Sequence, residues 1–159
     1  MLKLPIIRWG KPYESLESRE IRHFISGETI AQISQAGAGL LKRDLRKATA
    51  AREALRCIPC AELIQKVQQA ATLFRDGTLP MGDGTQTPAE FARAQSATTG
   101  LPEHMCRSNM EKNYYVLRHM DELLDALTRG LDLNILSHGY GTEERGVTVS
   151  YQAQSPVLG

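Results

Sequence analysis

The stretch of sequence that decides the fold is Ile25-Ser26-Gly27-Glu28-Thr29-Ile30-Ala31-Gln32-Ile33-Ser34-Gln35-Ala36, and an alanine-rich amphipathic segment follows it. Gly27 can take the positive φ that a tight turn requires. Ile30 and Ile33 lie in a short apolar run that is typical of a strand. The stretch therefore predicts a strand, a Gly-Glu turn, a second strand, and then a helix entered through Gly37 and Gly39.

Apolar residues recur at helical spacing from Leu40 to Leu55, and Pro59 separates this predicted helix from the next. The second helix has the clearest pattern in the chain, because its apolar residues follow three- and four-residue steps. These apolar residues are Leu63, Ile64, Val67, Ala70, Ala71 and Phe74, and we expect Leu63, Ile64, Val67, Ala70 and Phe74 to be buried.

Two more helices are predicted from their end signals. Thr87 and Glu90 form a capping box that begins a short helix ending at Gly100. Pro102 begins a long helix that is expected to run to about Arg129 and to stop at Gly130. Its predicted apolar face consists of Cys106, Met110, Tyr114, Leu117, Met120, Leu124 and Leu127.

The remaining segments predict loops and a hairpin. Residues 1–20 are expected to be irregular and residues 76–86 to form a loop, since both are interrupted by proline and glycine. Apolar and polar residues alternate in 131–135 and in 147–154, and a glycine-containing stretch separates the two. This alternation predicts a second hairpin, which would need a partner sheet because two strands alone are marginally stable in water.

Composition limits the classes of partner. The chain has 159 residues, 42% of them hydrophobic, with a net charge of +1, so electrostatics give no reason to expect nucleic acid or an anionic membrane. No apolar run approaches the length of a membrane span. Pro5 and Arg8 interrupt the apolar N-terminus, which excludes a secretory signal there. Three cysteines imply no disulfide framework, so a reducing cytoplasm is the expected location.

In this order, the motifs resemble the N-terminal part of the aldehyde dehydrogenase superfamily. The match runs over roughly residues 20–159, and no single motif is specific by itself. The motifs that carry it are Ser26-Gly27-Glu28, Ile30-Ala31-Gln32-Ile33, Ala48-Thr49-Ala50-Ala51-Arg52-Glu53-Ala54, Val67-Gln68-Gln69-Ala70-Ala71-Thr72-Leu73 and Thr99-Gly100-Leu101-Pro102. Leu101 stands where the family usually has lysine, the loop 78–87 is longer than in the family, and Pro156 would occupy a glycine position. These departures indicate a divergent branch.

The resemblance implies a helix-rich α+β fold: the N-terminal portion of a Rossmann-type α/β dehydrogenase with a projecting C-terminal β-hairpin. Residues 1–130 would be the helical and β-hairpin layer of the cofactor-binding domain. Residues 131–159 would be an oligomerisation hairpin and the start of the next strand. The chain would then form a homo-oligomer through this hairpin.

The resemblance also implies an activity for the intact protein. It would be an oxidoreductase that uses NAD or NADP and acts on an aldehyde or an acyl thioester, through a cysteine thiohemiacetal and hydride transfer. The nucleophile, the general base and the oxyanion asparagine of the family would lie beyond residue 159. We therefore expect no catalytic, cofactor-binding or metal-binding residue in 1–159. The alternative is a self-contained helical adaptor that adds its C-terminal hairpin to the sheet of another protein.

Several residues could carry chemistry but have simpler interpretations. Cys57 and Cys60 have the spacing of a redox dithiol, yet helices flank them and the βαβ context of that motif is missing, so packing at a helix junction is favoured. Cys106 lies on the apolar face of its predicted helix, with His104 on another face. The other histidines, His23, His119 and His138, have no zinc-binding spacing.

Two further stretches also favour simple structural roles. Residues 81–85, Met-Gly-Asp-Gly-Thr, lack the lysine and spacing of a phosphate-binding loop, so a turn is expected. The basic residues Lys42, Arg43, Arg46 and Lys47 lie opposite the apolar residues of their helix, which indicates a solvated helix face.

Overall fold

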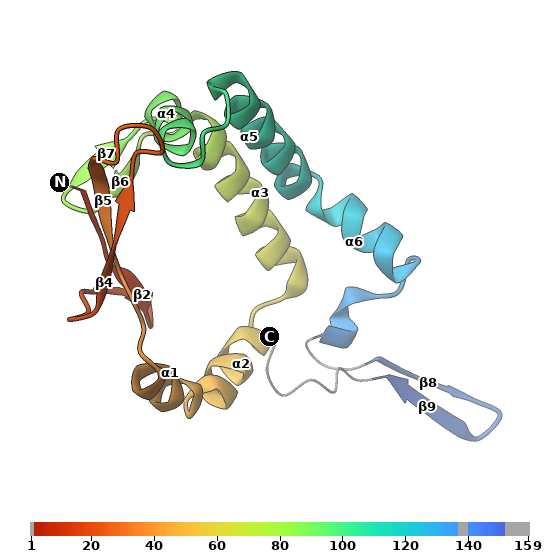
Figure 1. Cartoon of the computed structure of the whole chain (residues 1–159). Coiled ribbons are helices and arrows are strands. Elements are labelled where there is room, and N and C mark those ends of the chain that lie inside the picture. Colours follow the sequence, from red (N-terminus) through yellow and green to blue (C-terminus); the bar gives the residue numbers. More distant parts are fainter. Residues whose placement is uncertain (1, 137–139, 152–159) are drawn as a thin grey trace.

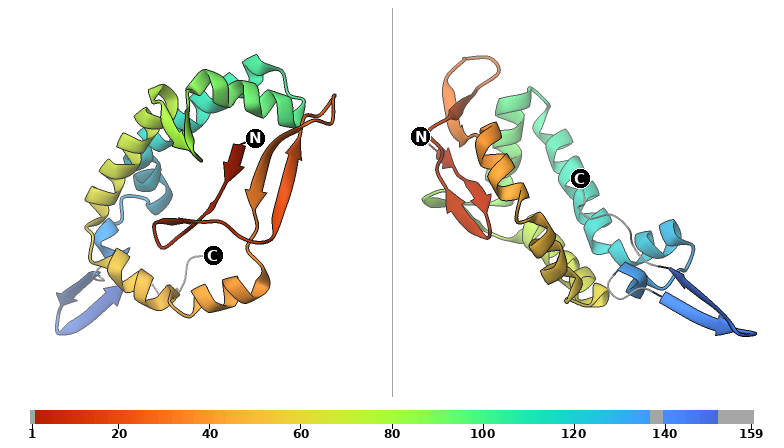
Figure 2. Two further views of the ribbon diagram at one scale, coloured as in Figure 1. Left: turned by 90° about the vertical axis from the view of Figure 1, so that its left-hand side faces the viewer. Right: turned by 90° about the horizontal axis from the view of Figure 1, so that it is seen from below.

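A computed structural model describes residues 2–136 and 140–151 of the chain (Figure 1). The fold is mixed α+β and rich in helix, as expected. Figure 1 shows an open frame: short strands form one side, α1 and α2 run along the bottom, and α3 with α5 and α6 form the other side. The views in Figure 2 show the same arrangement, with the β8–β9 hairpin projecting from the rest.

The hairpin predicted around Gly27 is present. β4 (Ser18–Arg22) and β5 (Thr29–Ser34) pair antiparallel, and Gly27 has a φ of 71° in the turn between them. β1 (Leu2–Leu4) adds to β5 in parallel, which gives a three-stranded sheet in the order β1-β5-β4. Ala31 is the buried residue of the central strand. Residues 25–36 therefore contain the central strand of this sheet.

The prediction that residues 1–20 are irregular is wrong. Besides β1 and the start of β4, they contain a hairpin of β2 (Ile6–Arg8) and β3 (Lys11–Tyr13). Its two turn residues, Trp9 and Gly10, both have positive φ, which is the geometry that suits a two-residue hairpin. Pro5 thus separates β1 from β2 and Gly10 lies in the turn, whereas Pro12 lies within β3 itself. Residues 76–86 likewise hold a short hairpin of β6 (Leu79–Met81) and β7 (Gly84–Gln86).

Two helices expected to be continuous are each interrupted. Residues 40–55 form α1 (Ala38–Leu45) and α2 (Ala48–Arg56). The long helix after Pro102 is divided into α5 (Glu103–Arg118) and α6 (Met120–Thr128), because His119 leaves helical geometry with a φ of −104° and a ψ of 31°. His119 donates its N–H to the last turn of α5 and its carbonyl accepts from α6, so the break costs few backbone hydrogen bonds.

The start and end signals predicted for the helix after Thr87 are confirmed. α3 runs over Cys60–Asp76, and α4 (Pro88–Thr99) begins with the capping box of Thr87 and Glu90. In that box the Thr87 backbone N–H donates to the Glu90 carboxylate, which lowers the pKa of Glu90. Gly100 ends α4 in the left-handed conformation, with a φ of 77°. These short-range signals are legible in the sequence because each partner lies within a few residues.

The core is small and lies between α3, α4 and α5. Ala92, Cys106 and Met110 are buried together, and Phe74 and Phe91 pack against them. The two phenylalanine rings meet edge to face, with their centroids 5.7 Å apart. On α3, Ala71 is completely buried, whereas its neighbour Ala70 is exposed, which corrects the predicted buried face at that position. On α6, Leu127 is 80% exposed, so the predicted apolar face of this helix does not extend to its end.

The tail differs from the prediction in one of its two strands. Residues 133–136 form the 3₁₀ turn η1 (Leu133–Leu136), so the predicted strand 131–135 is absent. The hairpin instead pairs β8 (Tyr140–Glu144) with β9 (Val147–Tyr151), turning at Arg145 and Gly146. Alternation alone did not distinguish a strand from this turn because five residues are too few to define a period. Positions 152–154 of the second predicted strand lie outside the described residues.

The chain exposes far more surface than a compact protein of its size. Its solvent-accessible surface is 11723 Å² for a mass of 17.6 kDa. The usual scaling for folded monomers gives about 7,900 Å² for that mass. Figure 1 shows the described sheets and helices arranged as an open frame and not as stacked layers.

The β6–β7 turn supplies a test of the packing around β1. Gly82 has a φ of 58°, and a β-carbon at this position would lie 2.6 Å from the Lys3 carbonyl oxygen. We expect Gly82→Ala to lower the free energy of unfolding by about 2 to 3 kcal/mol, through the left-handed φ and the clash together. Urea unfolding followed by circular dichroism measures it.

Gly27→Ala is the matched control for this test, because Gly27 has a φ of 71° and no atom within 4 Å of the added β-carbon. This variant should lower the free energy of unfolding by about 1 kcal/mol, which is the cost of the left-handed φ alone. Equal losses in the two variants would contradict the close approach of the turn to β1.

Candidate functional site

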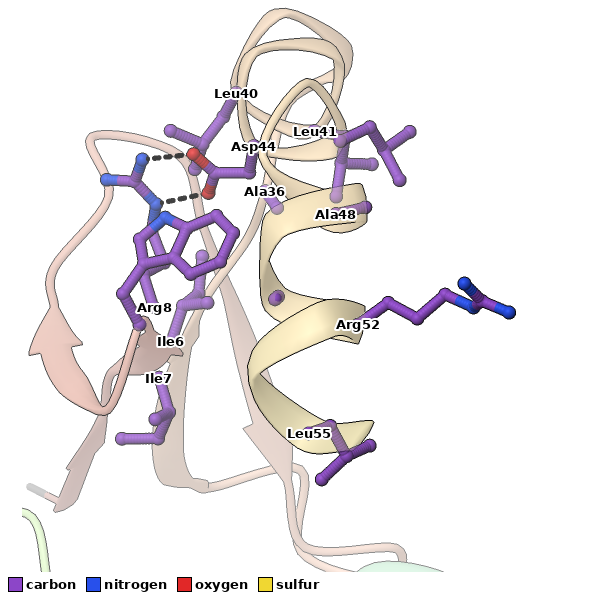
Figure 3. Close-up of a pocket in the computed structure, with 13 residues that line it drawn as sticks. Ile6, Ile7, Arg8, Ala36, Leu40, Leu41, Asp44, Ala48, Arg52 and Leu55 are labelled. Carbon is purple, nitrogen blue, oxygen red and sulfur yellow. Dashed lines mark hydrogen bonds and ion pairs between the residues drawn. The ribbon is translucent and has the colours of Figure 1, made fainter. Parts of the chain in front are cut away.

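An apolar groove lies between the β2–β3 turn and the helices α1 and α2 (Figure 3). Its volume is about 480 Å³. Its aliphatic lining comes from both sides: Ile6, Ile7, Leu40, Leu41, Leu45 and Leu55. Several of these are well exposed, including Ile7 at 67% and Leu45 at 64%, so the groove is open to solvent along its length.

A bidentate ion pair fixes the two walls of the groove to each other. The Arg8 Nε and one terminal nitrogen donate to the two carboxylate oxygens of Asp44, each at 2.6 Å. Figure 3 shows this pair at the end of the groove where β2 meets α1. Both side chains are largely shielded, with 18% and 24% of their surface exposed. The hydrogen bonds from Arg8 lower the pKa of Asp44, because they stabilise its ionised form.

Trp9 belongs to the same wall and has an unusual backbone conformation. Its φ is 53°, a left-handed value that bulky side chains rarely adopt. Trp9 is 49% exposed and lines the groove, and the Lys47 ammonium lies 5.6 Å from its ring centroid. This cation–π contact and the Arg8–Asp44 pair hold the turn against α1.

The basic residues Lys42, Arg43, Arg46 and Lys47 are exposed, as the predicted solvated face requires. The apolar residues on the other side of α1 are not buried, however: Leu41 is 52% exposed and faces the groove. In the part of the chain that the structure describes, none of these four cations forms an ion pair. The segment therefore combines exposed basic side chains with exposed leucines on one short helix.

The cysteines have structural positions. Cys57 is exposed at the end of α2, where its Sγ lies 3.3 Å from the Glu53 carbonyl oxygen, and half-buried Cys60 is the first residue of α3. The pair thus lies at a helix junction, as expected. Cys106 is 1% exposed in the core, and His104 is exposed on the same helix. A buried thiol of this kind is a packing residue.

The other histidines make local contacts. His23 accepts the N–H groups of Ile25 and Ser26 at its Nδ1 and so stabilises the β4–β5 turn. His119 lies 3.0 Å from a carboxylate oxygen of Glu122 and contacts the Tyr115 ring. His138 lies outside the described residues. Among residues 2–136 and 140–151, no three His, Cys, Asp or Glu side chains are grouped as a metal site would need.

The Met81–Thr85 stretch is the turn that the sequence predicts. Gly82 in this turn packs against the backbone of β1, with the Lys3 carbonyl oxygen beside it. A carbonyl oxygen repels a phosphate, so this turn is not suited to cradle one.

Sequence reasoning missed the groove. Its walls come from residues about 35 positions apart, and the Arg8–Asp44 pair that joins them leaves no periodic signal. The alternation of apolar residues Leu2, Leu4 and Ile6 was the available hint of strands at the N-terminus.

The Arg8–Asp44 pair predicts how stability changes with pH. Because the folded pKa of Asp44 is lower than the unfolded one, the pair contributes fully above the unfolded value near 3.9 and is lost as pH falls towards the folded pKa. Asp44→Asn should remove this part of the acid destabilisation. Urea unfolding of the wild type and the variant from pH 2 to pH 7 measures it.

Arg8→Gln is the partner variant for the same experiment. It should reduce the same fall in the free energy of unfolding at acid pH, because either substitution removes the ion pair. A variant that retained the full wild-type slope below pH 4 would show that the pair does not contribute to folding.

In the described part of the chain, no helix combines the length and apolar character needed to cross a bilayer. No protein-family model matches this sequence, and no curated protein matches it significantly.

Proposed function

We propose that this chain is the N-terminal scaffold of an NAD(P)-dependent oxidoreductase that acts on an aldehyde or an acyl thioester. It supplies structural and assembly surfaces, and the catalytic groups come from polypeptide outside these residues. The observation that carries the proposal is the exposed surface, 11723 Å² against about 7,900 Å² for a compact monomer of the same mass. A scaffold that is completed by further protein has this character.

The arrangement of the elements supports the same proposal. A short sheet lies on one side of a frame of amphipathic helices, and the β8–β9 hairpin projects away from it (Figure 1). Only five apolar residues of the described part are buried, so this layer needs a second one to enclose a full-sized core. The hairpin is the proposed contact between subunits of a homo-oligomer.

The described residues do not by themselves suit a dinucleotide. The one strand–Gly-x-Gly–helix connection is β5 to α1, through Gly37 and Gly39, and it lacks the third glycine of a dinucleotide fingerprint. The Glu17 carboxylate lies beside Gly37, 3.5 Å from where a β-carbon would be, so the start of α1 already faces an anion. A pyrophosphate there would meet like charge. NAD or NADP is therefore proposed for the intact enzyme and not for these residues.

The first experiment identifies the form of the protein in its own cells. An antibody raised against residues 60–76 should detect a species much larger than 17.6 kDa, and immunoprecipitation with it should recover aldehyde-dependent reduction of NAD or NADP. A species of 17.6 kDa without that activity would overturn the scaffold proposal and favour the self-contained adaptor.

The second experiment concerns activity of the isolated chain. The purified 159-residue chain should reduce neither NAD nor NADP with an aldehyde, and it should show no saturable binding of either by calorimetry, because the proposed nucleophile and general base lie outside these residues and the described residues do not suit a dinucleotide. Turnover that disappears in Cys57→Ser or Cys106→Ser would contradict the proposal.

A further inference from the structure

We propose that the groove between the β2–β3 turn and α1–α2 binds the alkyl chain of a single-chain lipid, one molecule at a time, and leaves the head group of the lipid in water. The ligand class is a long unbranched aliphatic chain, such as that of a long-chain alcohol. The inference rests on the lining, the charges and the size of the groove, and it does not depend on the dehydrogenase assignment.

The charged residues that line the groove are already paired, which selects an uncharged ligand. Three of the lining residues carry a charge: Arg8, Asp44 and Arg52. Arg8 and Asp44 form the bidentate ion pair with each other, and Arg52 pairs with Glu53. Figure 3 shows the Arg52 side chain directed away from Ile6. A charged group that entered the groove would lose its hydration and find no charge left to pair with.

The rest of the lining is apolar on both sides of the hollow. Ile6 and Ile7 line it from β2, and leucines line it from α1 and α2. Between the leucines, Ala48 and Ala51 have small side chains that leave room along the helices. A flexible chain can follow this space and remove its own methylene groups from water at the same time as the exposed isoleucines and leucines.

The size of the groove suits a chain better than a folded segment of protein. Its volume of about 480 Å³ lies within the range of roughly 300 to 1,000 Å³ that is typical of small-molecule sites. Two turns of an α-helix with side chains fill roughly 1,000 Å³, so a helix could not enter it. A methylene group takes about as much space as a water molecule, about 30 Å³, so a chain of about twelve carbons fits.

The groove is held in position before anything binds. Trp9, which lines it, has a φ of 53°, a conformation that is unfavourable for a bulky residue. Its neighbour Arg8 is fixed to Asp44, and the Lys47 ammonium contacts the Trp9 ring. Backbone outliers of this kind persist where the surrounding structure holds them, often at ligand sites. A preformed groove also spends no affinity on ordering its walls.

Trp9 makes the proposal directly measurable, because it is the only tryptophan of the chain and is 49% exposed. The probes are straight-chain primary alcohols from hexanol to dodecanol, each below its solubility limit. Titration into the full chain should shift Trp9 emission to shorter wavelength and saturate. The dissociation constant should fall about two- to fourfold with each added methylene group. An oligo(ethylene glycol) of the same length is the control, and this polar chain should give no shift.

Variants then assign the binding to the groove. Ala51→Leu should weaken dodecanol by about tenfold and hexanol less, because the added side chain takes up space that only a long chain needs. Leu45→Gln should weaken every alcohol by placing an amide in the lining. Ala70→Leu and Leu73→Gln are the matched controls, since both positions lie on α3 outside the groove. All four substitutions replace exposed side chains, so folding is retained.

Several results would overturn the proposal. An affinity that does not depend on chain length, or that Ala51→Leu leaves unchanged, would remove the groove as the site of an alkyl chain. A Trp9 shift with phosphatidylcholine vesicles and none with the alcohols would assign the surface to a membrane. A shift with a stapled leucine-rich helical peptide and none with the alcohols would assign it to a protein segment. A shift that depends only on protein concentration would assign it to a second copy of this chain.

Discussion

Ala71→Asp is expected to unfold the helical layer of this protein. Ala71 has no exposed surface and lies on α3, the helix that packs along α5 beside the core of Ala92, Cys106 and Met110. An aspartate there would bury a carboxylate without a partner, and its larger side chain would separate the helices. The loss should be about 4 kcal/mol or more, which is a large part of the stability of a small domain.

The adjacent residue provides a matched control for this substitution. Ala70 is exposed on the same helix, so Ala70→Asp adds the same charge and the same change in helix propensity without burying anything. It should cost less than about 1 kcal/mol. Urea unfolding followed by helical circular dichroism measures both variants, and similar midpoints for the two would show that the register of α3 is wrong.

Val67→Asp is expected to lower the free energy of unfolding by an amount between those of Ala71→Asp and Ala70→Asp. Sequence periodicity placed Val67 on the buried face, and in the structure it is half-buried on α3. A charge at a half-buried position keeps part of its hydration, so the loss should be smaller than for Ala71→Asp. A loss of free energy of unfolding that decreases from Ala71 to Val67 to Ala70 would show which face of α3 is buried.

The features that could be predicted from sequence are those whose causes are local. The capping box of Thr87 and Glu90 and the left-handed cap at Gly100 each depend on residues within one helical turn. The turn at Gly27 is similar, since its φ of 71° suits glycine almost alone. For these elements, the residues that determine the structure lie next to one another in the sequence.

The features that were missed depend on distant residues. β1 exists because Leu2 to Leu4 pair with residues 31–33, and without that pairing a three-residue strand has no reason to form. The groove exists because Arg8 reaches Asp44 across 36 positions. The breaks at Arg46–Lys47 and at His119 interrupt sequences with good helix formers, so propensity could not reveal them and packing had to decide.

The C-terminal hairpin is expected to make the isolated chain self-associate. β8 and β9 pair with each other, and in the described residues neither pairs with a third strand, so each leaves one edge of backbone N–H and C=O groups unpaired. Residues 147–154 contain no Lys, Arg, Asp, Glu or Pro, the residues that usually protect such an edge. An unprotected edge can pair with the same edge of another copy.

Removal of residues 141–159 should therefore give a more soluble and predominantly monomeric protein, which sedimentation velocity of both chains at several concentrations measures. The double substitution of Thr148 and Ser150 by lysine should act in the same direction with a smaller effect, because two like charges on a strand edge repel a second copy. Lysine at Gln65 and Gln69, exposed positions on α3, adds the same charge and should leave the association unchanged.

If the full chain stays monomeric at high concentration while amides 147–151 are protected from hydrogen exchange, the hairpin is already paired within one molecule. The proposal of a subunit contact through this hairpin would then fail, and the adaptor would lose its means of binding for the same reason.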